Sequence, residues 1–208
     1  ESRLHDPFAL LGRHGDAIRL WRPWAVAVWV GPERLPAQRV GATGLFVLQH
    51  AGAPGPHPEV HWRDVAGTMH CDIDPYSFAP QLGDLDLHLF GEGRHRHAYR
   101  MLGAHPCTAD GVTGTRFATW APNAERVSVA GSFNDWNRSK HPLLPREHSG
   151  IWEGFVPGVG HGAVYKYHIA SRHNGYRVDK ADPLAQCTEM PPQTASVVWE
   201  SVYDWGDE

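Results

Sequence analysis

The sequence predicts an all-β protein built from two β-sandwich modules in tandem. Three observations support this fold class. The 22 glycines and 17 prolines divide the chain into short segments. Many of these segments alternate in polarity and are rich in β-branched and aromatic residues, which is typical of strands separated by turns. The chain also carries one pattern twice, which indicates an internal duplication.

Strands are expected where apolar and polar residues alternate most regularly. These segments are residues 115–120, 126–130, 151–156, 165–170 and 176–179. In the fourth segment Tyr165, Tyr167 and Ile169 share one face, because successive side chains of a strand point to opposite faces. Lys166 and His168 share the other face. Since the apolar trio belongs in the core, Lys166 is expected to point outward.

A single short helix is predicted at residues 82–90, where Leu82, Leu85 and Leu89 have the i, i+3, i+7 spacing of one helix face. A polar, glycine-containing linker of sequence GEGRHRH follows it. We place the boundary between the modules here. The first module then comprises residues 1–91 and the second comprises residues 92–208.

The duplication rests on three short matches that share a Leu-Gly pair, a Trp-x-Pro triplet before a strand, and an Asp-Pro pair. The matched segments are residues 7–14 with 98–105, 21–30 with 120–130, and 74–76 with 182–184. The second copy is longer, and the run GSFNDWN at residues 131–137 lies where the two copies diverge. The first copy lacks this run, so it is interpreted as a degenerate copy that keeps the fold.

Composition excludes several classes of partner. The net charge is −4 and the pI is about 6.4, without a block of basic residues, so nucleic acid and anionic membrane surfaces are not expected partners. The longest apolar run, residues 24–30, is too short to span a membrane. Three scattered cysteines predict no disulfide framework, and we expect reduced thiols in a cytoplasmic protein.

A candidate binding face surrounds Trp136. Glycine, serine, asparagine and aspartate suit a turn, but a turn has no local use for a tryptophan. An exposed indole can stack on the apolar face of a sugar ring, while Lys166, Asn134 and Asn137 can bond its hydroxyls. Tyr176 follows an Asn-Gly hairpin turn and is expected near the rim. The alternative is that Trp136 folds back as a lid on the sandwich.

Longer strings resemble a known family. The runs WAPNA at 120–124, VSVAGSFNDW at 127–136 and YKY at 165–167 resemble the family-48 carbohydrate-binding module. This module is similar to the glycogen-binding domain of the AMP-activated protein kinase β subunit. Together with EGRHRHAYRMLGAH at 92–105 and DGVTGTRF at 110–117, the whole chain resembles the amino-terminal region of bacterial glycogen branching enzymes.

The resemblance implies a fold, a function and a set of site residues. Both modules are expected to be immunoglobulin-like sandwiches. In the family, the loop tryptophan and the strand lysine contact glucan, which maps onto Trp136 and Lys166, and a second aromatic maps onto Tyr176. The family's asparagine near the last strand has no counterpart in residues 194–199. In the first copy His61 stands in place of the lysine.

The resemblance also implies partners. The expected ligand is α-1,4-glucan, as glycogen or malto-oligosaccharides, and the second partner is the catalytic barrel of a longer 1,4-α-glucan branching enzyme. Such a parent transfers α-1,4 chains to form α-1,6 branches. No cofactor is expected. Two alternatives stay open: a stand-alone glucan-binding module without catalysis, and the module region of a debranching enzyme.

Two patterns point to other chemistry and are rejected. The run Arg177-Val178-Asp179 resembles the nucleophile signature of α-amylases, but retaining chemistry needs a second carboxyl about 5 Å away and a barrel of about 250 residues. The chain itself is therefore predicted to be inactive. The 15 histidines show neither an HxxxH helix nor paired Cys/His spacing, so we expect solvated histidines and no metal site.

Overall fold

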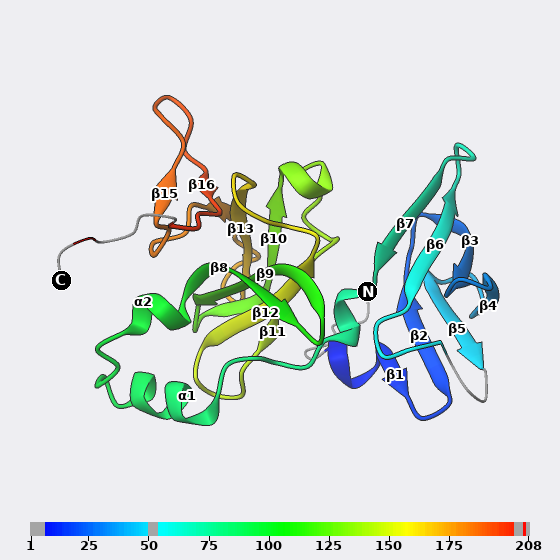
Figure 1. Ribbon diagram of the computed structural model, residues 1–208, viewed down its shortest axis with the longest axis horizontal. Coiled ribbons are helices and arrows are strands. Elements are labelled where there is room, and N and C mark those ends of the chain that lie inside the picture. Colours follow the sequence, from blue (N-terminus) through cyan, green and yellow to red (C-terminus); the bar gives the residue numbers. More distant parts are fainter. Residues whose placement is uncertain (1–6, 50–53, 202–205, 207–208) are drawn as a thin grey trace. The chain divides into compact units, whose positions relative to one another are not determined.

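A computed structural model describes residues 7–49, 54–201 and 206 (Figure 1). The described chain is nearly all β, which confirms the predicted fold class. Its contacts divide it into two compact units, Glu1–Ala79 and Pro80–Glu208. Among the described residues, no helix has the length and apolar character that crossing a membrane requires.

The first unit is one antiparallel sheet of seven strands in the order β1-β2-β5-β4-β3-β6-β7. Its elements are η1 (Pro7–Ala9), β1 (Gly12–His14), β2 (Ala17–Trp21), β3 (Ala25–Val30), β4 (Leu35–Arg39), β5 (Leu45–Gln49), β6 (Glu59–Asp64), β7 (Met69–Ile73) and η2 (Pro75–Ser77). Strand β4 pairs with both β3 and β5. It therefore joins one half of the sheet, β1, β2 and β5, to the other half, β3, β6 and β7. Side chains from both halves meet in a single core, which includes Leu20, Phe46, Val30 and Trp62. The unit is thus a sandwich made by one sheet.

The second unit holds two sheets packed face to face. Its elements are α1 (Asp84–Gly91), α2 (Ala98–Met101), β8 (Gly103–Ala109), β9 (Val112–Trp120), β10 (Ala124–Gly131), η3 (Ser132–Asn134), β11 (Leu144–Pro145), β12 (Ile151–Pro157), β13 (Val164–Ser171), β14 (Arg177–Lys180), β15 (Cys187–Thr188) and β16 (Ser196–Val197). One sheet has the order β11-β12-β9-β8, and the other has β10-β13-β16-β15, with β14 on β13. Phe117 and Trp152 from the first sheet meet Val129, Tyr165 and Tyr167 from the second in one core.

All five predicted strand segments lie on strands of this unit, namely β9, β10, β12, β13 and β14, and the predicted helix lies on α1. Within β13, Tyr165 and Tyr167 are buried, as the alternation predicts. The short helix α2 was not predicted, because four residues are too few to show a helical period.

The division between the units lies ahead of the boundary expected at residues 91 and 92. The segment before α1 packs on the second unit, where buried Leu82 joins a cluster with Met101 and Ile151. The backbone N–H of Leu82 donates to Glu153 Oε2 at 3.0 Å, and Arg146 Nη1 donates to the carbonyl of Leu82 at 2.9 Å. These contacts span more than sixty residues of sequence, so local pattern could not indicate them.

The two units share an order of paired strands and the positions of the matched Leu-Gly and Asp-Pro pairs, which we call landmarks. Strands β3, β6 and β7 pair in that order in the first unit, as β10, β13 and β14 do in the second. Gly12 has a φ of +83°, and a Cβ there would lie 2.5 Å from the carbonyl oxygen of Tyr76. Gly103 has a φ of +105°, and its Cβ would lie 3.3 Å from the carbonyl oxygen of Leu184. In each unit the Leu-Gly landmark therefore packs against the segment that carries the Asp-Pro landmark.

Candidate functional site

The loop after β10 is fixed from the inside by Asn134. This side chain is 1% exposed. Its Oδ1 accepts a hydrogen bond from the N–H of Gly131 at 2.9 Å, and its Nδ2 donates to the carbonyl of Val129 at 2.9 Å and contacts His141 Nδ1 at 2.8 Å. The amide thereby ties the end of β10 to the returning segment of the loop.

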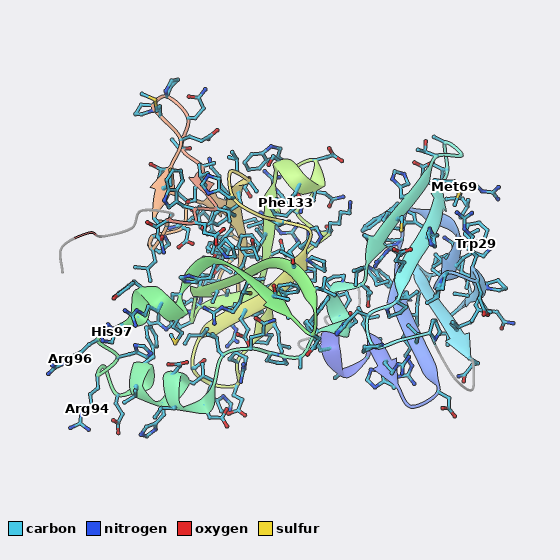
Figure 2. All side chains as sticks on the ribbon, in the orientation of Figure 1. Trp29, Met69, Arg94, Arg96, His97 and Phe133 are labelled. Atoms are coloured by element: carbon cyan, nitrogen blue, oxygen red, sulfur yellow. The ribbon has the colours of Figure 1, made fainter. Side chains whose placement is uncertain are left out.

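This burial corrects the expectation that Asn134 contacts sugar. A side chain whose carbonyl and amide groups are both engaged inside the protein has no free face for a ligand. Phe133 is labelled in Figure 2. Its ring packs against Phe117 and His141, with centroid distances of 6.1 and 5.6 Å. Asn134 and Phe133 therefore build the loop, and ligand contacts are left to its outer residues.

Trp136 lies on the outside of this loop. Its side chain is 45% exposed, and its backbone N–H donates to the carbonyl of Gly131 at 3.0 Å. Asp135 and Trp136 have φ values of +55° and +56°. A left-handed backbone costs roughly 1–2 kcal/mol for a residue other than glycine, and two in succession need support from the surrounding structure. The anchored loop supplies that support and carries the indole to the surface, whereas a lid would be buried.

Lys166 lies beside the start of the Trp136 loop. It stands opposite Ala130 on β10, next to the pair Gly131 and Tyr165 from which the loop departs. Its Nζ donates to Thr194 Oγ1 at 2.7 Å. Thr194 is exposed and lies just before β16, where the expected asparagine is missing. The hydroxyl of Thr194 thus occupies this side of the candidate site, and no sequence pattern marks Thr194 as a site residue.

Tyr176 and Asn137 occupy the margins of the site. Tyr176 is 58% exposed and follows the turn of Asn174 and Gly175, both at positive φ. The next residue in the chain pairs with Ala170, which lies about 13 Å along β13 from Lys166 at roughly 3.3 Å per residue. Asn137 is exposed, and its Oδ1 accepts a hydrogen bond from the N–H of Ser139 at 2.9 Å. The Trp136 loop thus departs beside the start of β13, near Lys166, whereas Tyr176 lies beyond its other end.

Asp179 has a structural role in this arrangement. Arg138 donates to both of its oxygens, at 3.1 and 2.5 Å, and His168 Nδ1 lies 2.7 Å from Oδ1. Partial burial by itself would raise the pKa of Asp179, but the hydrogen bonds from Arg138 and His168 outweigh it and lower the pKa. The carboxylate fastens the Trp136 loop, through Arg138, to β14. This pairing supports the rejection of Asp179 as a nucleophile.

One family model matches the part of the chain that carries this candidate site. Residues 101–185 match the family model described as carbohydrate-binding module 48 (isoamylase N-terminal domain). This segment contains β8 to β14, the Trp136 loop, Lys166 and Tyr176.

Curated relatives match nearly the whole chain. A 1,4-alpha-glucan branching enzyme from Methylococcus capsulatus is 46% identical over 100% of this chain and 29% of its own length. One from Streptomyces coelicolor is 50% identical over 98% of this chain and 27% of its own length. The chain thus spans less than a third of these relatives and corresponds to their amino-terminal region.

Solved structures give a weaker match. A maltotriose complex of a pullulanase variant from Klebsiella pneumoniae is 16% identical over 92% of this chain and 24% of its own, with a TM-score of 0.41. A pullulanase from Bacillus subtilis in complex with maltose has a TM-score of 0.40 at 18% identity, over 91% of this chain and 26% of its own. Scores this low add nothing to the assignment of the site.

Proposed function

We propose that this chain, which is similar along its length to the amino-terminal region of bacterial 1,4-alpha-glucan branching enzymes, binds and positions α-1,4-glucan for a longer enzyme. The observation that carries the proposal is the exposed indole of Trp136, which is held outward by a loop anchored from within. This indole lies in the segment that matches a carbohydrate-binding module.

Binding follows from the chemistry of a glucose unit. The ring has an apolar C–H face that stacks on the indole of Trp136, and its hydroxyls take hydrogen bonds from Lys166 and Thr194. Tyr176 precedes Arg177, whose partner Ala170 lies about 13 Å along β13 from Lys166. Because this span exceeds one sugar ring, the site suits a chain of several glucose units. Asn137 can bond the chain at the loop end of the site.

The binding should be weak. Covering one aromatic face buries on the order of 150–250 Å², or about 4–6 kcal/mol at roughly 25 cal/mol/Å². Ordering a flexible oligosaccharide and losing its free motion offset part of this gain. A Kd of about 0.1–1 mM for a malto-oligosaccharide is the expected outcome.

The parent activity belongs to this proposal as well. We expect the longer protein to cut α-1,4 chains and rejoin them as α-1,6 branches, with this chain packed on its catalytic barrel. The three cysteines are all free, in keeping with a reducing cytoplasm. A stand-alone glucan-binding module and a debranching parent are the alternatives. Identities of 46–50% to branching enzymes favour a branching parent, and the coding sequence after residue 208 distinguishes all three.

The test compares two exposed tryptophans, Trp136 in the loop after β10 and Trp120 on β9 of the other sheet. Trp136→Ala should abolish detectable binding of maltoheptaose in an NMR titration and leave the melting temperature nearly unchanged. Trp120 is 55% exposed on β9, and Trp120→Ala should bind as the wild type does. Undiminished binding in folded Trp136→Ala protein contradicts the proposal. A loss of about 3–5 kcal/mol of stability in that variant would instead support the lid alternative.

A further inference from the structure

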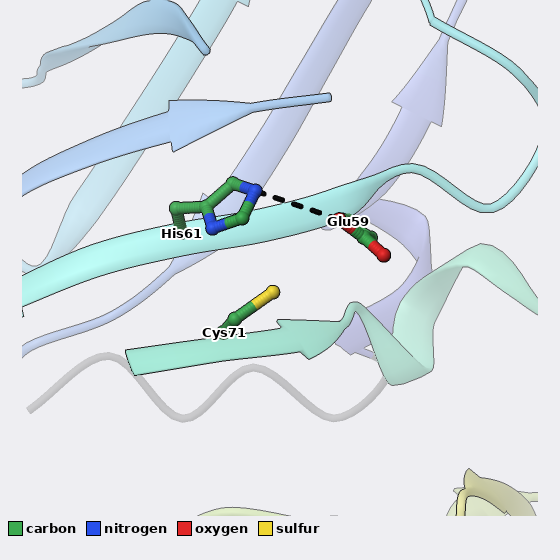
Figure 3. Close-up of side chains that lie close together, drawn as sticks. All are labelled: Glu59, His61 and Cys71. Atoms are coloured by element: carbon green, nitrogen blue, oxygen red, sulfur yellow. Dashed lines mark ion pairs between the residues drawn. The ribbon is translucent and has the colours of Figure 1, made fainter. Parts of the chain in front are cut away.

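Three side chains of different chemistry meet on strands β6 and β7 of the first unit (Figure 3). Glu59 and His61 lie two residues apart on β6 and therefore project from the same face. Cys71 stands directly opposite His61 on β7. The carboxylate, imidazole and thiol ligand atoms all lie within 4.8 Å of one another. Strand pairing, with no loop involved, sets this geometry.

The distances approach those of a bound metal. Tetrahedral zinc has bonds of about 2.0–2.3 Å, which puts neighbouring ligand atoms roughly 3.3–3.7 Å apart. Glu59 Oε2 and His61 Nε2 already lie 3.6 Å apart. The thiol of Cys71 needs to move by about 1 Å to reach the same range, which takes a rotation of roughly 35° about its Cα–Cβ bond and strains the side chain modestly.

Position and charge also suit a cation. The His61 side chain is 14% exposed, so its ring is held in place, while Glu59 is 61% exposed and keeps the site open to solvent. Partial burial, followed by the carboxylates of Glu59 and Asp72, raises the pKa of the Cys71 thiol. Asp72 is itself paired with Arg22 at 2.9 Å, so Glu59 is the carboxylate that would face a cation. A thiolate and a carboxylate would balance the two charges of a zinc ion.

We propose that Glu59, His61 and Cys71 bind zinc, with a water molecule in the fourth position. Sulfur, nitrogen and oxygen ligands together favour zinc, whereas magnesium and calcium prefer oxygen alone. The ion would cross-link β6 and β7 and stabilise their hairpin. This proposal departs from the expectation of no metal site. Sequence spacing gave no sign of it, because His61 and Cys71 are ten residues apart and meet only through strand pairing.

Cobalt reports directly on the thiolate ligand. Chelator-treated protein in a non-thiol reductant should develop a thiolate-to-cobalt charge-transfer band in the near ultraviolet when Co²⁺ is added, and Zn²⁺ should remove the band. Cys71→Ser should lose it. Cys107→Ser and Cys187→Ser are matched controls on the other free cysteines and should keep it.

Two further variants test the other ligands. His61→Gln and Glu59→Gln should each raise the Kd for Zn²⁺ at least about tenfold, because even the loss of a supporting contact around a metal costs this much. His70→Gln is the control, since His70 pairs with Asp64 on the same hairpin at 2.9 Å. Zinc should also raise the melting temperature of the wild type and not that of Cys71→Ser. The absence of the band in the wild type, or its survival in Cys71→Ser, would overturn the proposal.

Discussion

Two residues apart in the loop after β10, Asn134 and Trp136 have opposite environments. Asn134 is 1% exposed and bonds the backbone on both sides, whereas Trp136 is 45% exposed. Residue type predicts a turn here and marks the tryptophan as unusual. It cannot tell which polar residue is buried, because burial of Asn134 depends on His141, which returns to it from the far end of the loop.

Removal of the Asn134 amide should destabilise the second unit. Asn134→Ala leaves the N–H of Gly131 and the carbonyl of Val129 buried without their partner, which costs about 1–3 kcal/mol for each unsatisfied group. Urea unfolding should show this loss, together with weaker maltoheptaose binding as the loop loosens. Asn137→Ala, an exposed position in the same loop, should change the free energy of unfolding by less than about 0.5 kcal/mol. Equal stability of the two variants would contradict this role.

A buried carboxyl gives the first unit a pH-dependent stability. Arg22 Nη1 donates to Asp74 Oδ1 at 3.3 Å, but Asp74 Oδ2 has no partner among the described residues. Burial raises the pKa of Asp74 from 3.8 to about 6, although Arg22 opposes the shift. The pKa of Arg22 itself is raised, since its two carboxylate partners, Asp72 and Asp74, outweigh its own burial. The ion pairs therefore outweigh burial for the charged form of Arg22, whereas burial outweighs the ion pair for the charged form of Asp74.

The sign of the effect follows from proton binding. Between pH 4 and pH 6 the folded state holds the Asp74 proton more tightly than the unfolded state, so this contribution to stability is present at low pH and is lost as pH rises through 6. The loss is about 3 kcal/mol. In Asp74→Asn, chemical unfolding measured from pH 4 to pH 7.5 should lack this decline, while Asp72 continues to pair with Arg22. A constant difference between variant and wild type across this range would count against the assignment.

At the scale of elements, strand pairing decides which side chains meet. Local alternation was enough to predict β9, β10, β12, β13 and β14, because the period of a strand is visible within five or six residues. The residue pairs of the two proposed sites are not visible in this way. Lys166 reaches Thr194, and His61 faces Cys71, only after the sheets form. The unit boundary likewise depends on contacts between Leu82 and Glu153.

The Leu-Gly landmark offers a test of how elements are held together. Gly12→Ala would introduce both a left-handed alanine and a Cβ that lies 2.5 Å from the carbonyl oxygen of Tyr76. Gly15 has a φ of +60°, and no atom lies within 4 Å of the position a Cβ would take. Gly15→Ala therefore costs only the strain of a left-handed alanine, without a steric clash. We expect Gly15→Ala to cost about 1–2 kcal/mol and Gly12→Ala about 1–3 kcal/mol more, as measured by thermal unfolding. Similar losses in both variants would show that the close approach to Tyr76 is unimportant.

At the scale of the whole chain, each of the two units has a core of its own. The first core is centred on Leu20, Phe46 and Trp62, and the second on Phe117 and Trp152 with the tyrosines of β13. Strand pairing and the Leu-Gly landmarks repeat between the units, as the duplicated sequence predicts. The proposed sugar-binding residues all lie in the second unit, and the loop that carries Trp136 has no counterpart in the sequence of the first copy.

The chain by itself should neither cleave nor branch amylose. Retaining glycoside chemistry needs two carboxyl groups about 5 Å apart within a barrel of about 250 residues, whereas this chain of 208 residues folds as two β units over its described part. Asp179 is the residue that most resembles a nucleophile, and its oxygens are taken by Arg138 and His168. Iodine-stained amylose incubated with the chain should therefore keep the spectrum of a protein-free sample. A spectral change that disappears in Asp179→Asn would contradict this prediction, whereas a change that persists in that variant would point to a contaminating enzyme.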